Sequence, residues 1–253
     1  CIRGERVVFQ NLSFSVAVGE ALILRGPNGS GKSTLLRLAA GFLKPAQGEL
    51  KWRDARAGAG AGDDLDDYRD KIHYLGHLDA VKPALSVAEN LEFWVAFDGS
   101  RSVDADCERA LDQLDLSHLA DVPGRYLSAG QRRRLNIARV AATAKPLWLL
   151  DEPSVSLDDA SVARLADLIA GHRAGGGMAM IAIARRSASS RPATASSRNW
   201  TRMRICSRIF ICASFSGGSA TAIAVSTRQG NPPLNTGGNQ YSVNSVSSVA
   251  FDR

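Results

Sequence analysis

A glycine-rich stretch near the start of the chain has the residue types and the spacing that bind phosphate. Residues 26–34 fit the pattern G-x-x-x-x-G-K-[ST], in which glycines let backbone N–H groups turn inward toward phosphate oxygens. The nine residues are Gly26, Pro27, Asn28, Gly29, Ser30, Gly31, Lys32, Ser33 and Thr34. We expect Lys32 to neutralise the β- and γ-phosphates of a nucleotide such as ATP, and Ser33 to offer its hydroxyl to Mg²⁺.

A second candidate site is an acidic pair that directly follows an apolar run. Asp151 and Glu152 come after Leu-Trp-Leu-Leu at 147–150, which is typical of the carboxyl end of a buried strand. Asp151 can hold Mg²⁺ directly or through water, and Glu152 can orient and deprotonate an attacking water as a general base. A strand that enters a solvated turn gives the same pattern, so the assignment depends on the phosphate-binding stretch upstream.

Apolar periodicity predicts the elements that must position these two sites. Continuous apolar runs at 21–24 and 147–150 are typical of strands that are buried on both faces, and a helix must follow the glycine-rich stretch. Further strands are expected at 7–9, 12–16, 48–52, 71–75 and 178–184, and further helices at 104–115, at 159–172, and from residues 86 and 130. Strands that alternate with helices predict an α/β fold with a mostly parallel core sheet.

The net charge of +6 is unevenly distributed along the chain. Residues 185–253 hold nine arginines and a single acid, so this segment carries +8 and residues 1–184 carry −2. Because the body of the chain is not basic, we expect no nucleic-acid partner. The α/β pattern also stops near residue 185, and we expect the Arg/Ser-rich segment 185–253 to be a disordered tail or the product of a frameshift.

Bulk properties restrict the class of protein further. No run in the 253 residues approaches the roughly 18 apolar residues that a membrane span needs, and no signal peptide opens the chain. The four cysteines show neither metal-ligand nor disulfide-framework spacing, which indicates reduced thiols in the cytoplasm. Since the sequence starts without Met, we expect N-terminal residues to be missing.

A third motif carries a family resemblance. Residues 127–131, Leu-Ser-Ala-Gly-Gln, resemble the LSGGQ signature of the ATP-binding-cassette (ABC) ATPases, with Ala129 in the place of one glycine. The motif lies upstream of the acidic pair, and residues 156–158 resemble the D-loop of the same family. The resemblance covers residues 1–184. It implies an ABC-type P-loop NTPase domain with a small antiparallel β region and a helical subdomain at about 85–135, beside the core sheet.

In this family two domains enclose two ATP molecules, so the resemblance implies a homodimer of nucleotide-binding domains. The signature of one protomer then contacts the γ-phosphate that the other protomer binds. Ser128, Gly130 and Gln131 are the residues of this chain that match the contacting positions. Their chemistry is consistent with that role, because Ser128 offers a hydroxyl and Gly130 permits close approach. The helix that follows also directs its positive end at the phosphate.

A narrower resemblance concerns residues 75–83, 89–94 and 127–134. These segments resemble the CcmA family, the ATP-binding subunits of haem-handling transporters in bacterial cytochrome c maturation. His77 falls where many ABC proteins have Gln, and the resemblance implies a sensor of the γ-phosphate or Mg²⁺; the alternative is a plain loop residue. The implied partners are an integral membrane transporter subunit of the CcmB kind, and a CcmC-like one. The implied location is peripheral, on the cytoplasmic face of the bacterial inner membrane.

Two departures from the family pattern leave alternatives open. ABC ATPases place a switch histidine after the strand that follows the D-loop, and residues 180–187 contain none. Where the family stacks an aromatic residue on adenine, Arg3 offers only a guanidinium plane. One alternative is therefore a catalytically impaired cassette that binds ATP. Another is a soluble ABC ATPase acting on nucleic acid or ribosomes, which the absence of sustained heptads between Lys32 and Ala129 argues against.

Two further groups of residues, a pair of histidines and a run of arginines, could have either a structural or a functional role. His73 and His77 are four residues apart, but they fall in a predicted strand and loop, so a metal-binding pair is not favoured. The three arginines at 132–134 could form a patch for a membrane or nucleic acid, and the favoured interpretation is a solvated helix face.

Overall fold

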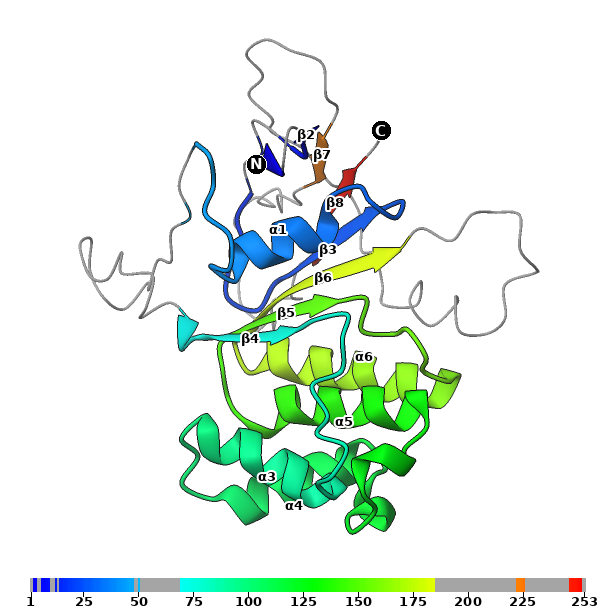
Figure 1. Ribbon diagram of the computed structural model, residues 1–253. Helices are drawn as coiled ribbons and strands as arrows, with labels where there is room; N and C mark the ends of the chain where they lie inside the picture. Colours follow the sequence, from blue (N-terminus) through cyan, green and yellow to red (C-terminus); the bar gives the residue numbers. More distant parts are fainter. Residues whose placement is uncertain are drawn as a thin grey trace, which may run out of the picture.

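The computed structural model describes residues 2–3, 6–9, 12, 14–47, 50, 69–184, 222–225 and 246–251. A six-stranded sheet lies at its centre, with the strand order β4-β5-β6-β3-β8-β7 (Figure 1). The strands are β3 (Ala21–Gly26), β4 (Ile72–Leu75), β5 (Leu147–Asp151), β6 (Met178–Ala184), β7 (Ala222–Val225) and β8 (Val246–Phe251). All neighbouring pairs are parallel except β7–β8, so the predicted α/β fold with a mostly parallel core sheet is confirmed.

The apolar strands supply two separate cores, because successive side chains of a strand point to opposite faces. In β5, Leu147 and Leu149 lie in the core on the α1 side, whereas Trp148 and Leu150 lie in the larger core among the other helices. All four side chains are at most 5% exposed. Burial on both faces explains why the sequence of this strand is continuously apolar and does not alternate.

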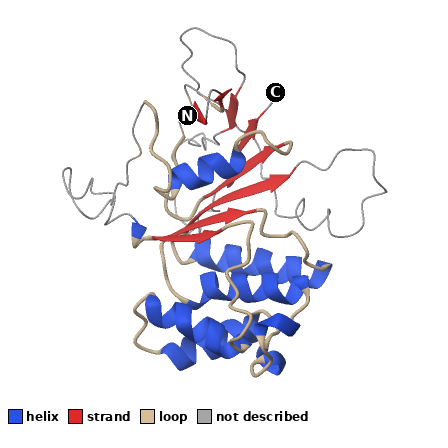
Figure 2. Cartoon of the chain, viewed as in Figure 1, coloured by secondary structure: helices blue, strands red, loops and turns tan. Residues whose placement is uncertain are grey.

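Helices cover both faces of the sheet (Figures 1 and 2). Helix α1 (Lys32–Ala39) lies on one face, and α5 (Ala129–Ala142) and α6 (Asp159–Ala174) lie on the other. Helices α3 (Val87–Phe97) and α4 (Val103–Gln113) lie beyond α5, with two short 3₁₀ helices, η1 (Ser117–Leu119) and η2 (Gly124–Tyr126). These elements, with the first turns of α5, occupy the range 85–135 that was predicted as a helical subdomain.

Local sequence signals define the starts of three helices. Ser86 caps α3 in a reciprocal capping box with Glu89, as its sequence pattern predicts. Ser128 caps α5 in the same way: its Oγ accepts from the N–H of Gln131, and the Gln131 side chain accepts from the N–H of Ser128. Asp158 caps α6 by accepting from the N–H of Ser161, and this hydrogen bond lowers the pKa of Asp158.

The N-terminal region differs in part from its predicted strands. A short antiparallel pair joins β1 (Ile2–Arg3) to β2 (Arg6–Val7). The strand predicted at 12–16 is wrong for the residues described there, which form no ladder. Leu12, Phe14 and Val16 are nevertheless half-buried against the α1-side core, so their alternation reflects contact with that core. The predicted strand at 48–52 and the loop at 55–67 lie outside the described residues, apart from residue 50.

The C-terminal segment contains two strands that the sequence pattern does not predict. Strand β8 pairs in parallel with β3, and β7 pairs with β8. The remaining residues of 185–253 lie outside the described part of the chain, so the expectation of a disordered or frameshifted tail stays a prediction there. Among the helices in the described ranges, none is both long enough and apolar enough to cross a membrane.

Candidate functional site

The phosphate loop (residues 26–34) connects the end of β3 to the start of α1. Gly29 and Gly31 adopt φ angles of 79° and 98°, a left-handed region that favours glycine. A Cβ atom at Gly31 would also lie 2.6 Å from Cγ1 of Val8. In the described part of the chain no side chain caps the N-terminus of α1, which leaves its first N–H groups for an anion, as in other phosphate-binding loops.

Lys32 lies buried beneath this loop. It is 4% exposed, and its Nζ donates to the carbonyl oxygens of Gly26 at 2.9 Å and Pro27 at 2.8 Å. Burial lowers the pKa of Lys32, and the nearby carboxylates of Glu152 and Asp151 act in the opposite direction. The ammonium group is therefore held among polar partners at the place where phosphate oxygens would enter the loop.

A hydrogen bond joins the phosphate loop to the acidic pair. Ser33 Oγ donates to Asp151 Oδ1 at 2.9 Å, although the two residues are 118 positions apart. Asp151 is 2% exposed and lies at the end of β5. A hydroxyl beside a carboxylate is a donor set that Mg²⁺ accepts, and Ser30 Oγ adds a buried hydroxyl with no partner among the described residues. These residues fit a magnesium–nucleotide ligand.

Glu152 occupies the turn that ends β5. Its φ of 48° is unusual for a residue other than glycine, and its N–H donates to the carbonyl of Ala182 at 3.0 Å. The half-buried side chain is close enough to Lys32 for its charge to raise the pKa of that lysine. The predicted base, the predicted metal ligand Asp151 and the phosphate loop are thus brought together.

The two histidines of the β4 region lie in different surroundings. His77 is exposed in the loop that follows β4, which we call the His77 loop (residues 76–79). His73 is buried within β4, with Nε2 2.6 Å from Thr143 Oγ1 and 3.8 Å from a carboxylate oxygen of Asp98. Burial lowers the pKa of His73 to about 4. The described parts of the chain contain no cluster of three or more metal-binding side chains.

The signature (residues 127–131) starts α5 and lies against the D-loop (residues 156–158). A Cβ atom on Gly130 would lie 2.9 Å from the carbonyl oxygen of Ser156, so glycine is needed for this close approach. Ser128 and Ala129 are exposed at the helix start. No hydrogen bond within the described ranges joins the signature to the phosphate loop of the same chain, so one chain does not itself unite these two motifs.

The interpretation of residues 132–134 as a solvated helix face is wrong. Arg133 is 4% exposed, and its guanidinium donates to backbone carbonyls at the end of β5 and in the His77 loop. Arg132 donates to the Leu127 carbonyl, and Arg134 donates to the Leu114 carbonyl. A signal for Arg133 was present in the sequence, because Ile137 follows four residues later on the same, buried face of the helix.

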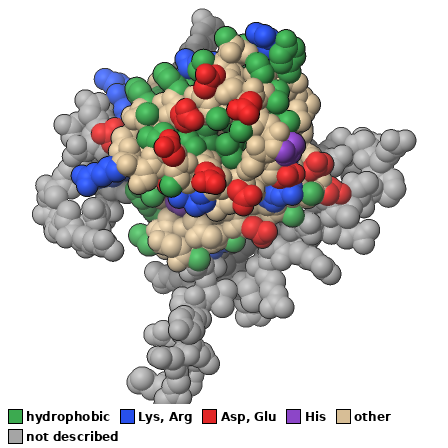
Figure 3. All heavy atoms as spheres, turned by 90° about the horizontal axis from the view of Figure 1, so that it is seen from below, with side chains coloured by type: hydrophobic (Ala, Val, Ile, Leu, Met, Phe, Trp, Pro, Cys, Tyr) green, Lys and Arg blue, Asp and Glu red, His purple; other side chains and the backbone are tan. Residues whose placement is uncertain are grey.

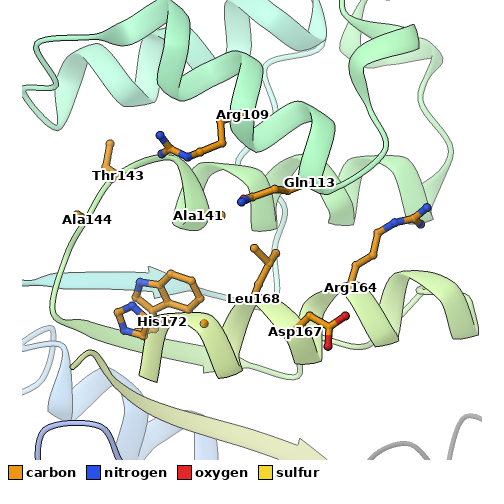
Figure 4. A pocket seen from close by; sticks show the side chains of 11 residues that line it. Arg109, Gln113, Ala141, Thr143, Ala144, Arg164, Asp167, Leu168 and His172 are labelled. Atoms are coloured by element: carbon orange, nitrogen blue, oxygen red, sulfur yellow. The ribbon is translucent and has the colours of Figure 1, made fainter. Parts of the chain in front are cut away.

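A cavity of about 480 Å³ lies away from this site, between α4, α5 and α6 (Figure 4). None of the predicted site residues lines it. Its two arginines already have acidic partners, since Arg109 contacts Asp106 at 2.6 Å and Arg164 contacts Asp115 at 3.6 Å. The predicted phosphate and metal ligands thus lie elsewhere, at the phosphate loop and the end of β5.

Comparisons with known proteins agree with this geometry. Residues 9–155 match the family described as ABC transporter. The chain is 53% identical over 187 residues to the cytochrome c biogenesis ATP-binding export protein CcmA of Paramagnetospirillum magneticum, covering 72% of this chain and 82% of that protein. It is 52% identical over 181 residues to the protein of the same name from Rhodospirillum rubrum, covering 72% and 75%.

Solved structures share the fold. A dimeric ATP-binding cassette in a post-hydrolysis state, bound to ADP and Pi, superposes with a TM-score of 0.61 at 26% identity, covering 72% of this chain and 83% of that one. An ATP-binding subunit of an ABC transporter superposes with a TM-score of 0.58 at 24% identity, covering 68% and 70%.

Proposed function

The chain belongs to the ABC transporter family, among its CcmA relatives, and we propose that it is the ATP-hydrolysing subunit of the haem exporter of bacterial cytochrome c maturation. The observation that carries the ATPase assignment is the Ser33–Asp151 hydrogen bond, which unites the phosphate loop with the acidic pair. The export assignment rests on identity to the CcmA proteins over most of their length.

The site residues suit phosphoryl transfer from ATP to water. Lys32 and the N–H groups at the start of α1 would stabilise the charge on the phosphate oxygens. Ser33 and Asp151 would hold Mg²⁺, which when bound neutralises charge on the β- and γ-phosphates. Glu152 would orient the attacking water and accept its proton, and we assign His77 to sensing the γ-phosphate or Mg²⁺.

A second copy of the chain completes the site in this proposal. Ser128, Gly130 and Gln131 of one protomer would contact the γ-phosphate in the phosphate loop of the partner. Two features support this arrangement: among the described residues the signature has no hydrogen bond to its own phosphate loop, and Ser128 and Ala129 are exposed at the start of α5. ATP would then close the dimer, and hydrolysis would reopen it.

The membrane partner would dock on the helical subdomain, at the peripheral, cytoplasmic side of the inner membrane. Two apolar side chains of this subdomain face solvent, with Phe97 75% exposed and Phe93 43%, and Leu78 of the His77 loop is 84% exposed. On the face seen in Figure 3, acidic side chains are spread around a hydrophobic area and are more frequent than basic ones. The exposed acids of this subdomain are Glu89, Glu92, Asp104, Glu108, Asp112, Asp115 and Asp121. Such a surface suits a CcmB-like protein, with a CcmC-like one as a further candidate, and would repel nucleic acid.

Complementation tests this function. The full chain is expressed in a bacterium that lacks its own CcmA protein, and covalently bound haem in c-type cytochromes is measured. We expect the chain to restore a haem signal that is weaker than that of the bacterium's own CcmA protein, because residues 180–187 contain no switch histidine. We expect Lys32→Ala to abolish the signal and to lose binding of a fluorescent ATP analogue, because the ammonium group that meets the phosphates is gone. Lys44→Ala, at an exposed lysine after α1, is the matched control.

Two outcomes would contradict the proposal separately. An absence of haem signal from a chain that hydrolyses ATP would exclude the haem-export assignment alone. Unchanged affinity for the ATP analogue in Lys32→Ala would exclude the phosphate-loop assignment itself.

A further inference from the structure

One buried arginine, Arg133, belongs to the helix that starts at the signature and contacts two other segments that carry predicted site residues. It lies in α5, five residues after Ser128 of the signature. Its Nε donates to the Pro153 carbonyl at 3.3 Å, its Nη1 to the Gly76 carbonyl at 2.9 Å and to Asp79 Oδ1 at 3.5 Å, and its Nη2 to the carbonyls of Asp151 and Glu152, both at 2.8 Å.

The guanidinium group is suited to this position because its donors are fixed in one plane and can serve several acceptors at once. Burial lowers the pKa of Arg133, whereas the charge of Asp79 and its hydrogen bond oppose that shift. The cation is retained in a site that is 4% exposed, and backbone carbonyls form most of its surroundings. A buried charge of this kind is costly unless every donor finds a partner.

The contacts with β5 fix the backbone on both sides of Glu152. The Asp151 carbonyl belongs to the peptide plane before the Cα atom of Glu152, and the Glu152 carbonyl belongs to the plane after it. The N–H of the first plane is also bonded, to the carbonyl of Ala182. Because both planes are held, the direction of the Cα–Cβ bond of Glu152 is set, even at its unfavourable φ of 48°.

The contact with Gly76 extends the same restraint to the loop that carries His77. One side chain therefore ties together the helix that starts at the signature, the turn that carries Glu152 and the His77 loop. Movement of α5 would shift the backbone of the Glu152 turn and of the His77 loop, because the planar guanidinium group of Arg133 is bonded to both.

We propose that Arg133 is a positioning residue for ATP hydrolysis. It sets the direction of the Glu152 carboxylate and holds the His77 loop at a fixed position relative to α5. The proposal rests on the function assigned to Glu152 above. A purely structural role predicts a loss of stability and nucleotide binding together. The positioning role predicts a loss of the hydrolysis rate while ATP affinity is kept.

The test compares the full chain with Arg133→Gln and Arg133→Lys in single-turnover hydrolysis and in titration with a fluorescent ATP analogue. We expect either variant to slow hydrolysis by about 10- to 100-fold, because a displaced base loses its near-attack geometry, with ATP affinity unchanged. Lys does not rescue the rate, since one ammonium group cannot reach acceptors in both segments. Arg134→Gln is the matched control: it removes the same charge from the same helix, where the acceptors are Leu114 and Asp115, and should keep the rate.

A double variant distinguishes this inference from the proposed function. In a Glu152→Gln background, Arg133→Gln should cause a much smaller further loss of rate, because the carboxylate that it positions has already been removed and only its restraint on the His77 loop is left to lose. If Arg133→Gln slowed hydrolysis as strongly in the Glu152→Gln background as in the parent chain, the inference would be overturned. An unchanged rate in Glu152→Gln alone would instead overturn the assignment of the base.

A milder variant covers the case in which replacement of Arg133 prevents folding. Asp79→Ala removes only a partner carboxylate, whose side chain is 27% exposed, and leaves the guanidinium in place. We expect a smaller loss of rate in the same direction, with ATP affinity unchanged. A full rate in Asp79→Ala, together with unfolded Arg133 variants, would show that Arg133 serves folding alone and would overturn the inference.

Discussion

At the scale of single residues, the site holds its buried charged side chains with hydrogen bonds to nearby groups. Lys32 is held by two backbone carbonyls of its own loop, and Asp151 is held by the Ser33 hydroxyl. Neither group depends on exposed contacts, which contribute little to stability. The phosphate loop is therefore preorganised around the position of the phosphates, as electrostatic catalysis requires.

A residue outside the site, His73, gives a pH prediction. Burial lowers its pKa to about 4, a stronger effect than the charge of Asp98, which acts in the opposite direction; Lys145 and Arg139 lower the pKa further, and the hydrogen bond with Thr143 raises it. The unfolded chain has the ordinary value of about 6.5. Between these values the unfolded state binds a proton that the native state does not, so stability is complete above about pH 6.5 and falls toward pH 4.

The measurement is urea unfolding from pH 7.5 to 5, on the parent chain and on His73→Asn, which cannot titrate. Relative to the variant, the free energy of unfolding of the parent should fall by at most about 1.4 kcal/mol per pH unit below pH 6.5. Parallel pH profiles for the two proteins would show that His73 is not the titrating group.

At the scale of elements, the two capping boxes offer a matched pair. Ser86 starts α3 and Ser128 starts α5 with the same reciprocal bonds, but only Ser128 belongs to the signature. Replacement of either serine by Ala should lower the free energy of unfolding by about 1 kcal/mol, because one cap bond is lost. Only Ser128→Ala should also weaken the ATP-dependent dimer, as measured by analytical ultracentrifugation. Equal dimer formation in the two variants would argue against a contact between Ser128 and the partner's nucleotide.

The elements also show which parts of the fold could be predicted from sequence. The central strands and most helices are predicted by apolar runs and apolar spacing, and the start of α3 is also predicted by its capping box, because these are local signals. The prediction of a strand at 12–16 was wrong because every second side chain there is half-buried against the core, and such alternation can occur without backbone pairing to a neighbouring strand. The role of Arg133 was missed because its neighbours at 132 and 134 suggested a charged surface, and only the packed structure shows which carbonyls it reaches.

At the scale of the whole molecule, the described chain is one protomer of the proposed dimer. It carries a phosphate loop with its acidic pair, and a signature that has no bond to that loop. The chain's four histidines, at 73, 77, 118 and 172, all precede the end of β6, where the family places its switch histidine. That residues 185–253 result from a frameshift, and that the chain as written turns over slowly, remain predictions.

The most direct test of the central claim, that ATP closes two copies of this chain, is size-exclusion chromatography of Glu152→Gln with and without saturating Mg-ATP. The substitution removes the base but keeps the shape of the side chain, so bound ATP is hydrolysed very slowly and the closed state persists through the measurement. The double variant Lys32→Ala, Glu152→Gln is the control and should elute as a monomer throughout. We predict a shift of Glu152→Gln from monomer to dimer that requires ATP, and elution only as a monomer at saturating Mg-ATP would contradict the account.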